Sequence, residues 1–136
     1  MPNHFHLLLL QRKDNGISKF MKKVSDSYTK YFNLKYKRNG PLFQGQFKAV
    51  HVESDEQLIH LSRYIHLNPI AGYVTKNLEE YKWSSYSEYV GSLNGICFKN
   101  PILDLFTIKE NNYEQFLMDQ VDYARKLETL KHKLLE

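Results

Sequence analysis

Two short apolar segments, separated by a long amphipathic one, most constrain what this chain of 136 residues can fold into. Residues 4–11 are short, apolar and closed by a polar turn, which is typical of a strand. Residues 17–37 repeat apolar side chains every three or four positions, which predicts a long helix. Gly40 and Pro41 interrupt that pattern, and residues 47–52 then alternate as a second strand.

The remaining elements are predicted to be helical. Ser54 is a good N-cap, and Gln57 three residues later completes a capping-box pattern for a helix that begins near Asp55. Pro69 should end or bend that helix soon after Asn68. Residues 113–134 carry an apolar stripe at helical spacing. We therefore expect an α+β fold, with a small antiparallel sheet, helices packed on one face, and a C-terminal helix.

Charge is unevenly distributed along the chain. Residues 1–38 hold nine basic and two acidic side chains, whereas residues 39–136 hold ten basic and thirteen acidic ones. A concentrated basic segment indicates a polyanionic partner, usually nucleic acid, although a solvated helix face would have the same composition. The single cysteine, Cys97, excludes a disulfide framework and a cysteine-based zinc site. Without a long apolar segment or a secretory signal, we expect a cytoplasmic protein with no membrane partner.

A pair of histidines flanks Phe5 on the first predicted strand. Side chains alternate along a strand, so His4 and His6 would project to the same side. Two neutral imidazoles presented together are able to hold one divalent metal ion. Two ordinary histidines near a terminus would give the same pattern, and the pair alone does not distinguish these alternatives.

The second helix adds a possible nucleophile. Tyr64 and Asn68 are four residues apart and share a helix face, with His60 one turn earlier. Tyrosine is a known covalent nucleophile that needs activation, and the amide oxygen of Asn68 suits a hard cation. Spacing alone favours the other interpretation, in which Tyr64 is a half-buried packing residue.

Five stretches of the sequence, in order, resemble one protein family. They are MPNHFHLLL, GPLFQGQFKAVHVES, DEQLIHLSRYIHLNPI, AGYV and YKWSSYSEY, which together span about residues 1–91. The chain resembles the HUH superfamily of single-strand DNA transposases, and within it the REP-associated tyrosine transposases, which are relatives of the single-tyrosine insertion-sequence enzymes.

The resemblance implies specific roles. His4 and His6 would bind the metal, Mg²⁺ or Mn²⁺, with Asn68 as a further ligand, and Tyr64 would attack a phosphodiester in single-stranded or hairpin DNA. It also implies a ferredoxin-like or RRM-like sheet, a catalytic domain over residues 1–91 and a helical extension over residues 92–136. Monomer and homodimer both remain open. The side chains expected to contact DNA are the helix lysines and three residues near the site, namely Lys19, Lys22, Lys23, Lys30, Gln44, Lys48 and Arg63.

The chain also departs from the family pattern. Family members have a strand, a helix and a strand before the histidine pair, which here begins at residue 4, so we expect an N-terminally truncated protein. Gln46 replaces a family arginine, and the NPIAGYV segment is one residue shorter than its counterpart. A second hypothesis is therefore a catalytically inactive remnant, or a domesticated module that binds DNA hairpins. Trp83 is expected to be a packing anchor and His66 a structural residue.

Overall fold

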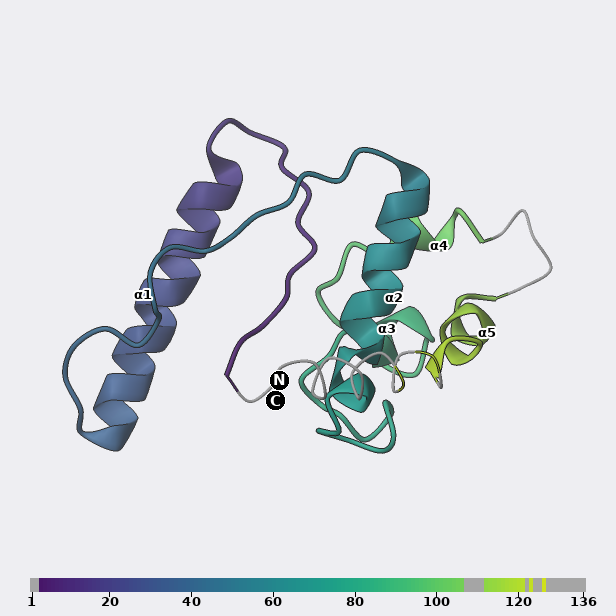
Figure 1. Ribbon diagram of the computed structural model, residues 1–136. Coiled ribbons are helices and arrows are strands. Elements are labelled where there is room, and N and C mark those ends of the chain that lie inside the picture. Colours follow the sequence, from purple (N-terminus) through teal and green to yellow (C-terminus); the bar gives the residue numbers. More distant parts are fainter. Residues whose placement is uncertain (1–2, 107–111, 122, 124–125, 127–136) are drawn as a thin grey trace. The chain divides into compact units, whose positions relative to one another are not determined.

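The computed structural model describes residues 3–106, 112–121, 123 and 126. Its helices are α1 (Gly16–Tyr36), α2 (Asp55–Ala71), α3 (Tyr86–Tyr89), α4 (Asn100–Leu103) and α5 (Tyr113–Met118) (Figure 1). The chain divides into two compact units. We call Leu8–His51 the basic unit, and we call Met1–Leu7 together with Val52–Glu136 the core unit.

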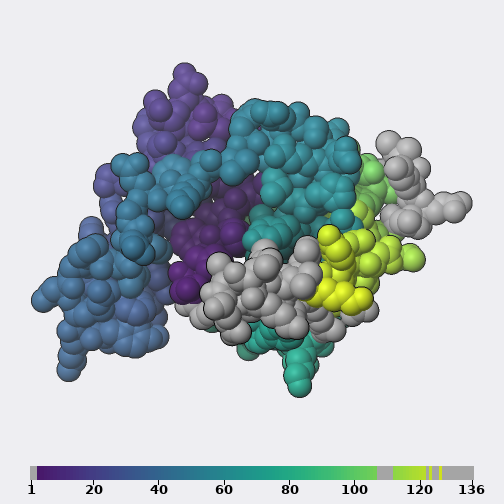
Figure 2. Space-filling model, in the orientation of Figure 1, coloured from purple at the N-terminus to yellow at the C-terminus, as the bar shows by residue number. Residues whose placement is uncertain are grey.

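The basic unit consists of α1 and the segments that flank it. The helix predicted over residues 17–37 is confirmed, and it ends where Lys37 adopts a left-handed conformation with φ 52°. The segment after α1 folds back along the helix, because the Asn33 side-chain amide donates to the Gly40 carbonyl oxygen at 2.9 Å. The Tyr28 and Phe43 rings lie 6.2 Å apart and extend that contact. Figure 2 shows the outer surface of this unit in purple and blue.

Helix α2 begins as the sequence predicts. The Ser54 hydroxyl oxygen accepts from the Gln57 backbone N–H at 3.1 Å, and the Gln57 side chain accepts from the Glu53 N–H at 2.8 Å. The first bond satisfies a donor that the helix N-terminus leaves unpaired, and the second ties the residue before the N-cap to the first turn. Pro69 lies inside the helix, which ends at Ala71, and the Gly72 N–H donates to the Asn68 carbonyl.

The hydrophobic core belongs to the core unit. Helix α2 packs against α4 and α5 (Figure 1), and Leu78, in the loop that leads to α3, is also buried. Removing such side chains from water is the main stabilising contribution to a fold of this kind. The buried residues here are Ser62, His66, Leu67, Pro69, Ile70, Leu78, Tyr86, Ile102, Tyr113 and Leu117.

The expected α+β fold is wrong. Neither residues 4–11 nor residues 47–52 form a strand, and the described part of the chain contains helices and loops without a sheet. Strands are stabilised by hydrogen bonds to a neighbouring strand, and the structure gives neither segment such a neighbour among the described residues. Most of their large apolar side chains accordingly stay exposed, including Leu10 at 66% and Val50 at 79%.

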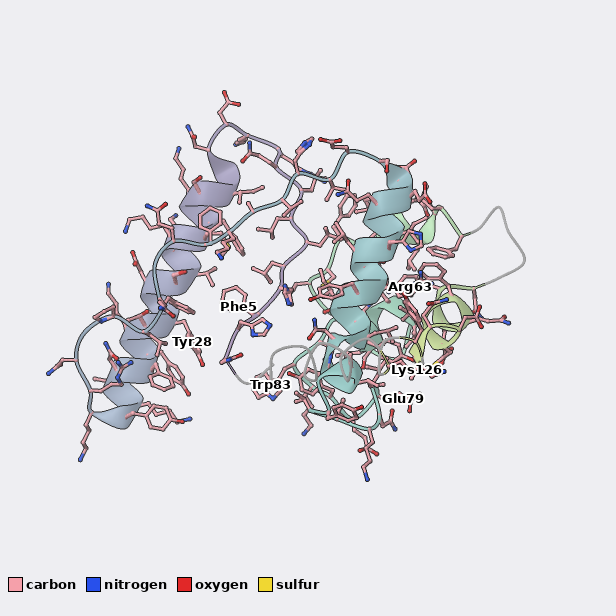
Figure 3. The ribbon with its side chains drawn as sticks, in the orientation of Figure 1. Phe5, Tyr28, Arg63, Glu79, Trp83 and Lys126 are labelled. Atoms are coloured by element: carbon pink, nitrogen blue, oxygen red, sulfur yellow. The ribbon has the colours of Figure 1, made fainter. Side chains whose placement is uncertain are left out.

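Two further expectations differ from the structure. Trp83 is 86% exposed in the loop before α3 (Figure 3), so it does not anchor the core. The helix predicted over residues 113–134 begins at Tyr113, but α5 ends at Met118. Residues 121, 123 and 126 are again helical, and residues 122, 124–125 and 127–134 lie outside the described residues. Among the described helices, none combines the length and the apolar character that crossing a membrane requires.

Candidate functional site

Three of the aromatic side chains singled out by the sequence meet in the core unit. The His4 and His6 ring centroids are 5.1 Å apart, and the rings are nearly perpendicular. The His6 and Tyr64 centroids are 5.5 Å apart, also edge to face. Tyr64 belongs to α2 and is 48% exposed. The structure thus brings together a histidine pair and a tyrosine separated by about sixty residues of sequence.

The ring nitrogens of His4 and His6 differ in their hydrogen bonding. His4 Nδ1–H donates a hydrogen bond to the Asn3 amide oxygen at 2.7 Å. This leaves Nε2 as the basic nitrogen of the ring. A hydrogen bond of this kind fixes the tautomer of metal-binding histidines. His6 Nε2 is buried and has no hydrogen-bond partner among the described residues. A buried polar atom without a partner is costly, and a ligand would relieve that cost.

Burial also favours a neutral His6. Desolvation lowers the pKa of His6 below its ordinary value, and the nearby charges of His4 and the N-terminal amino group lower it further. Neutral imidazole is the form that binds metal ions. The donor chemistry of His4 and His6 therefore fits a divalent metal.

The third expected ligand has weaker support. Asn68 is half-buried and lies one turn beyond Tyr64, so the i, i+4 spacing puts both side chains on the same side of α2. Within the described ranges, no group of three or more His, Cys, Asp or Glu side chains is arranged to hold a metal. A metal site here would consist of the two imidazoles and a neutral amide oxygen.

The opposite side of α2 contains a buried polar network that the sequence did not indicate. His66 is 2% exposed, with Nδ1 at 2.7 Å from the Tyr113 hydroxyl and Nε2 at 2.8 Å from the Ser85 hydroxyl. Tyr113 in turn donates to the Ser62 hydroxyl at 3.1 Å. Burial lowers the pKa of His66 to about 4, so its ring is neutral at physiological pH. Ser85 and Tyr113 lie 19 and 47 positions beyond His66 in the sequence, so no local pattern indicates that they pair with it.

Arg63 contacts α5. Its guanidinium carbon lies 4.1 Å from the centroid of the Phe116 ring, a cation–π distance, and Nη2 donates to His60 Nδ1 at 2.8 Å. Figure 3 shows the side chain extending from α2 toward α5. Burial lowers the pKa of Arg63 from its ordinary value, in keeping with this half-buried position. The expected DNA contact by Arg63 would require the side chain to leave Phe116.

The other expected DNA contacts lie in the basic unit and are exposed. At about 100° per residue, four of the five lysines of α1 fall within roughly one third of the helix circumference, and Lys35 lies outside that face. Asp26 lies on the same face, and its carboxylate pairs with Lys22 at 2.7 Å. The exposed residues are Lys19, Lys22, Lys23, Lys30, Gln44 and Lys48.

Comparison with known proteins gives one family. The family model described as "Transposase IS200 like" matches residues 1–68, which is half of the chain and includes His4, His6, Tyr64 and Asn68. No curated protein and no solved structure matches the chain significantly. On the strength of that match, the chain belongs to the family of IS200-like transposases.

Proposed function

We propose that this transposase cleaves and rejoins single-stranded or hairpin DNA through a covalent bond to Tyr64, as the HUH and REP-associated tyrosine transposases it resembles do. The observation that carries the proposal is the cluster of His4, His6 and Tyr64. In it, the buried His6 Nε2 has no hydrogen-bond partner within the described part of the chain, and the His6 ring lies 5.5 Å from the ring of the exposed Tyr64.

The proposed reaction is a transesterification. The Tyr64 hydroxyl oxygen attacks the phosphorus of a phosphodiester, a P–O bond to tyrosine forms, and the bond from phosphorus to the 3′ oxygen breaks. The tyrosine proton is transferred to the departing 3′ oxygen, which leaves a free 3′-OH and a 5′-phosphotyrosine. Because one phosphodiester replaces another, the reverse attack by a 3′-OH rejoins the strand without a nucleotide cofactor.

The residues of the site divide this work. His4 and His6, with Asn68, would hold Mg²⁺ or Mn²⁺, which when bound supplies neutralisation and polarisation of the scissile phosphate. Asn3 orients His4 through the Nδ1 hydrogen bond. Half exposure of Tyr64 permits a DNA backbone to approach it. Binding of the strand itself is assigned to the lysines of α1 with Gln44 and Lys48, by counterion release at phosphates.

Labelling a hairpin oligonucleotide at either its 3′ or its 5′ end tests the chemistry. After incubation with Mn²⁺, a label at the 3′ end of the DNA should migrate with the denatured protein, because the tyrosine retains the 5′ phosphate of the downstream fragment. A label at the 5′ end should appear on a shorter free strand. Tyr64→Phe should abolish the adduct, whereas Tyr73→Phe, which removes another exposed hydroxyl of the core unit, should retain it.

The same experiment identifies the competing function. If the unmutated chain binds the hairpin with strong salt dependence and yields no adduct in either labelling scheme, it is a DNA-hairpin-binding module and the cleavage proposal is wrong.

A separate measurement tests the metal. Mn²⁺ at about ten times its dissociation constant should stabilise the folded protein by about 1.4 kcal/mol, because a ligand that binds only the folded state shifts the unfolding equilibrium. The double substitution His4→Ala and His6→Ala should remove this stabilisation. His51→Ala removes an exposed histidine of the basic unit and should keep it. Equal stabilisation of the double variant would place the ion elsewhere.

A further inference from the structure

The helix that bears Tyr64 is held by polar groups on its buried side. Ser62 and His66 are four residues apart and form one buried stripe of α2, at 3% and 2% exposure. Tyr64 lies between them in sequence, about 200° around the helix from each, and therefore on the opposite side. Any contact that fixes the buried stripe also fixes the direction in which Tyr64 points.

The donor and the acceptor of each hydrogen bond in this stripe can be assigned. Tyr113 donates its hydroxyl proton to Ser62, which donates to the Ile59 carbonyl at 2.7 Å. The Tyr113 oxygen therefore accepts from the Nδ1–H of His66, and Nε2 of that ring accepts from Ser85. Each of the four side chains is satisfied in a single arrangement. A buried network of this kind specifies one geometry, because rotation of the helix would leave several of its groups unpaired at once.

We propose that Tyr113 and Ser85 are positioning residues, which fix the rotation of α2 through His66 and Ser62 and so hold Tyr64 beside His6. The chemical consequence of this inference rests on the proposed function, whereas its geometric part does not. Both positioning residues lie beyond residue 68, where the family match ends. The segment that follows the match would then be part of the working catalytic unit rather than an appended element.

The size of the expected effect follows from helix geometry. Side-chain atoms about 5–6 Å from the helix axis move by about 2 Å when the helix rotates by roughly 20°. Displacement of a reacting group by about 1 Å is able to cost about 100-fold in rate. A single lost hydroxyl that loosens α2 should therefore affect the reaction rate far more than it affects DNA affinity, which is assigned to the basic unit.

Two tyrosines offer a matched comparison. Tyr113 and Tyr86 are both buried, at 4% and 1% exposure, and both rings pack edge to face on His66. The Tyr113 hydroxyl joins the network, whereas the Tyr86 hydroxyl lies outside it and makes a long 3.5 Å contact with Glu114. Tyr113→Phe therefore removes the positioning bonds and Tyr86→Phe serves as the packing control. Ser85→Ala removes the bond to Nε2 from a half-buried site, and remains informative if Tyr113→Phe does not fold.

The first measurement is the nuclear Overhauser effect between the His6 and Tyr64 ring protons, at a temperature where circular dichroism shows each variant folded. Tyr113→Phe and Ser85→Ala should weaken this effect severalfold, and Tyr86→Phe should preserve it. The second measurement is adduct formation, which should slow tenfold to a hundredfold in the first two variants, with DNA affinity within twofold of the unmutated chain.

The outcomes separate the two proposals. An unchanged ring-to-ring effect in Tyr113→Phe and Ser85→Ala overturns the positioning role, as does an equal loss in Tyr86→Phe, which would indicate packing alone. Absence of an adduct from the unmutated chain overturns the proposed function, but the ring-to-ring comparison still decides whether the network positions Tyr64.

Discussion

The basic unit and the core unit differ in both charge and burial. The basic unit carries ten basic and two acidic residues, a net charge of +8, whereas the rest of the chain carries nine basic and thirteen acidic residues, a net charge of −4. Met21 is the buried apolar residue of the basic unit, and the other buried apolar residues described by the structure lie in the core unit. The two tasks of the proposed function, attracting a polyanion and positioning a nucleophile, thus fall to different parts of the chain.

This difference has a physical reason. Attraction to phosphate needs exposed positive charge and little rigidity, because counterion release depends on the number of contacts more than on their geometry. Attack on phosphorus needs a tyrosine held in one place, and rigidity comes from packing and from satisfied buried polar groups. Substitutions in the basic unit should therefore change DNA affinity, whereas substitutions in the core unit should change stability and the reaction. Substitutions that disturb packing should have the largest effects.

The largest effect is expected from Leu117→Ala. Leu117 is fully buried in α5, which packs against α2, and loss of a buried leucine side chain typically costs about 2–5 kcal/mol. Amide hydrogen exchange should show weaker protection throughout α2, with α1 nearly unchanged. Leu34→Ala is the matched control, because Leu34 is 85% exposed on α1 and its loss should change stability by less than about 0.5 kcal/mol. Equal loss of protection in α1 would mean that the units unfold together.

The second-largest effect is expected from acid, which should destabilise the core unit. The pKa of His66 is lowered from 6.5 to about 4 in the folded state, so the unfolded state binds more protons between these values. Stability contributed by neutral His66 is therefore complete above about pH 6.5 and is lost as the pH falls toward 4, by on the order of 3 kcal/mol. The titratable groups that face this ring are Tyr86, Tyr89 and Tyr113, whose pKa values burial raises, so they stay neutral in this range.

Denaturant unfolding at pH 7 and pH 4.5 measures this dependence. His66→Gln should flatten it, whereas His51→Gln, which alters an exposed histidine of the basic unit, should leave it as steep as in the unmutated chain. Undiminished acid sensitivity in His66→Gln would assign the effect to other groups.

These effects also show what the sequence could predict. Helices α1 and α2 and the Ser54 cap follow from patterns within a few residues, and all three are confirmed. The expected strands depend on a partner elsewhere in the chain, which periodicity does not identify, and that prediction is wrong. The same limit hid the pairing of His66 with Tyr113, because 47 residues separate two side chains that only the fold brings together.

The candidate site was more accessible to sequence reasoning. Alternation, helical spacing and a family resemblance point to His4, His6 and Tyr64, and their rings do lie together, although residues 4–11 form no strand. Their roles in metal binding and catalysis stay predictions. The position of Arg63 on Phe116 could not be foreseen, since nothing near residue 63 indicates an aromatic partner in α5.

Removing positive charge from α1 should act on the basic unit alone. Substitution of Lys19, Lys22, Lys23 and Lys30 by glutamine should weaken hairpin binding about tenfold to a hundredfold near 0.1 M salt, and should reduce the slope of log affinity against log salt by about 3. Stability should hold, because these side chains are exposed. Two double variants form a matched pair. The double substitution Lys19→Gln and Lys23→Gln should lower the affinity for hairpin DNA, whereas Lys76→Gln and Lys82→Gln, in the core unit, should not. Identical slopes in the two doubles would show that the lysines of α1 form only a solvated face.

The smallest effect should come from Asp26→Asn, which removes the one negative charge from the lysine face of α1. Asp26 pairs with Lys22 at 2.7 Å, and both side chains are exposed, so breaking the pair should leave the unfolding midpoint unchanged within error. Release of Lys22 and loss of repulsion toward phosphate should instead raise DNA affinity about two- to threefold at low salt, with the gain disappearing at high salt because exposed charges are screened. Asp14→Asn, which neutralises an exposed carboxylate outside the helix, should give a smaller gain. Titration of labelled hairpin DNA at two salt concentrations measures both variants, and equal gains would mean that net charge, not the face of α1, attracts the DNA.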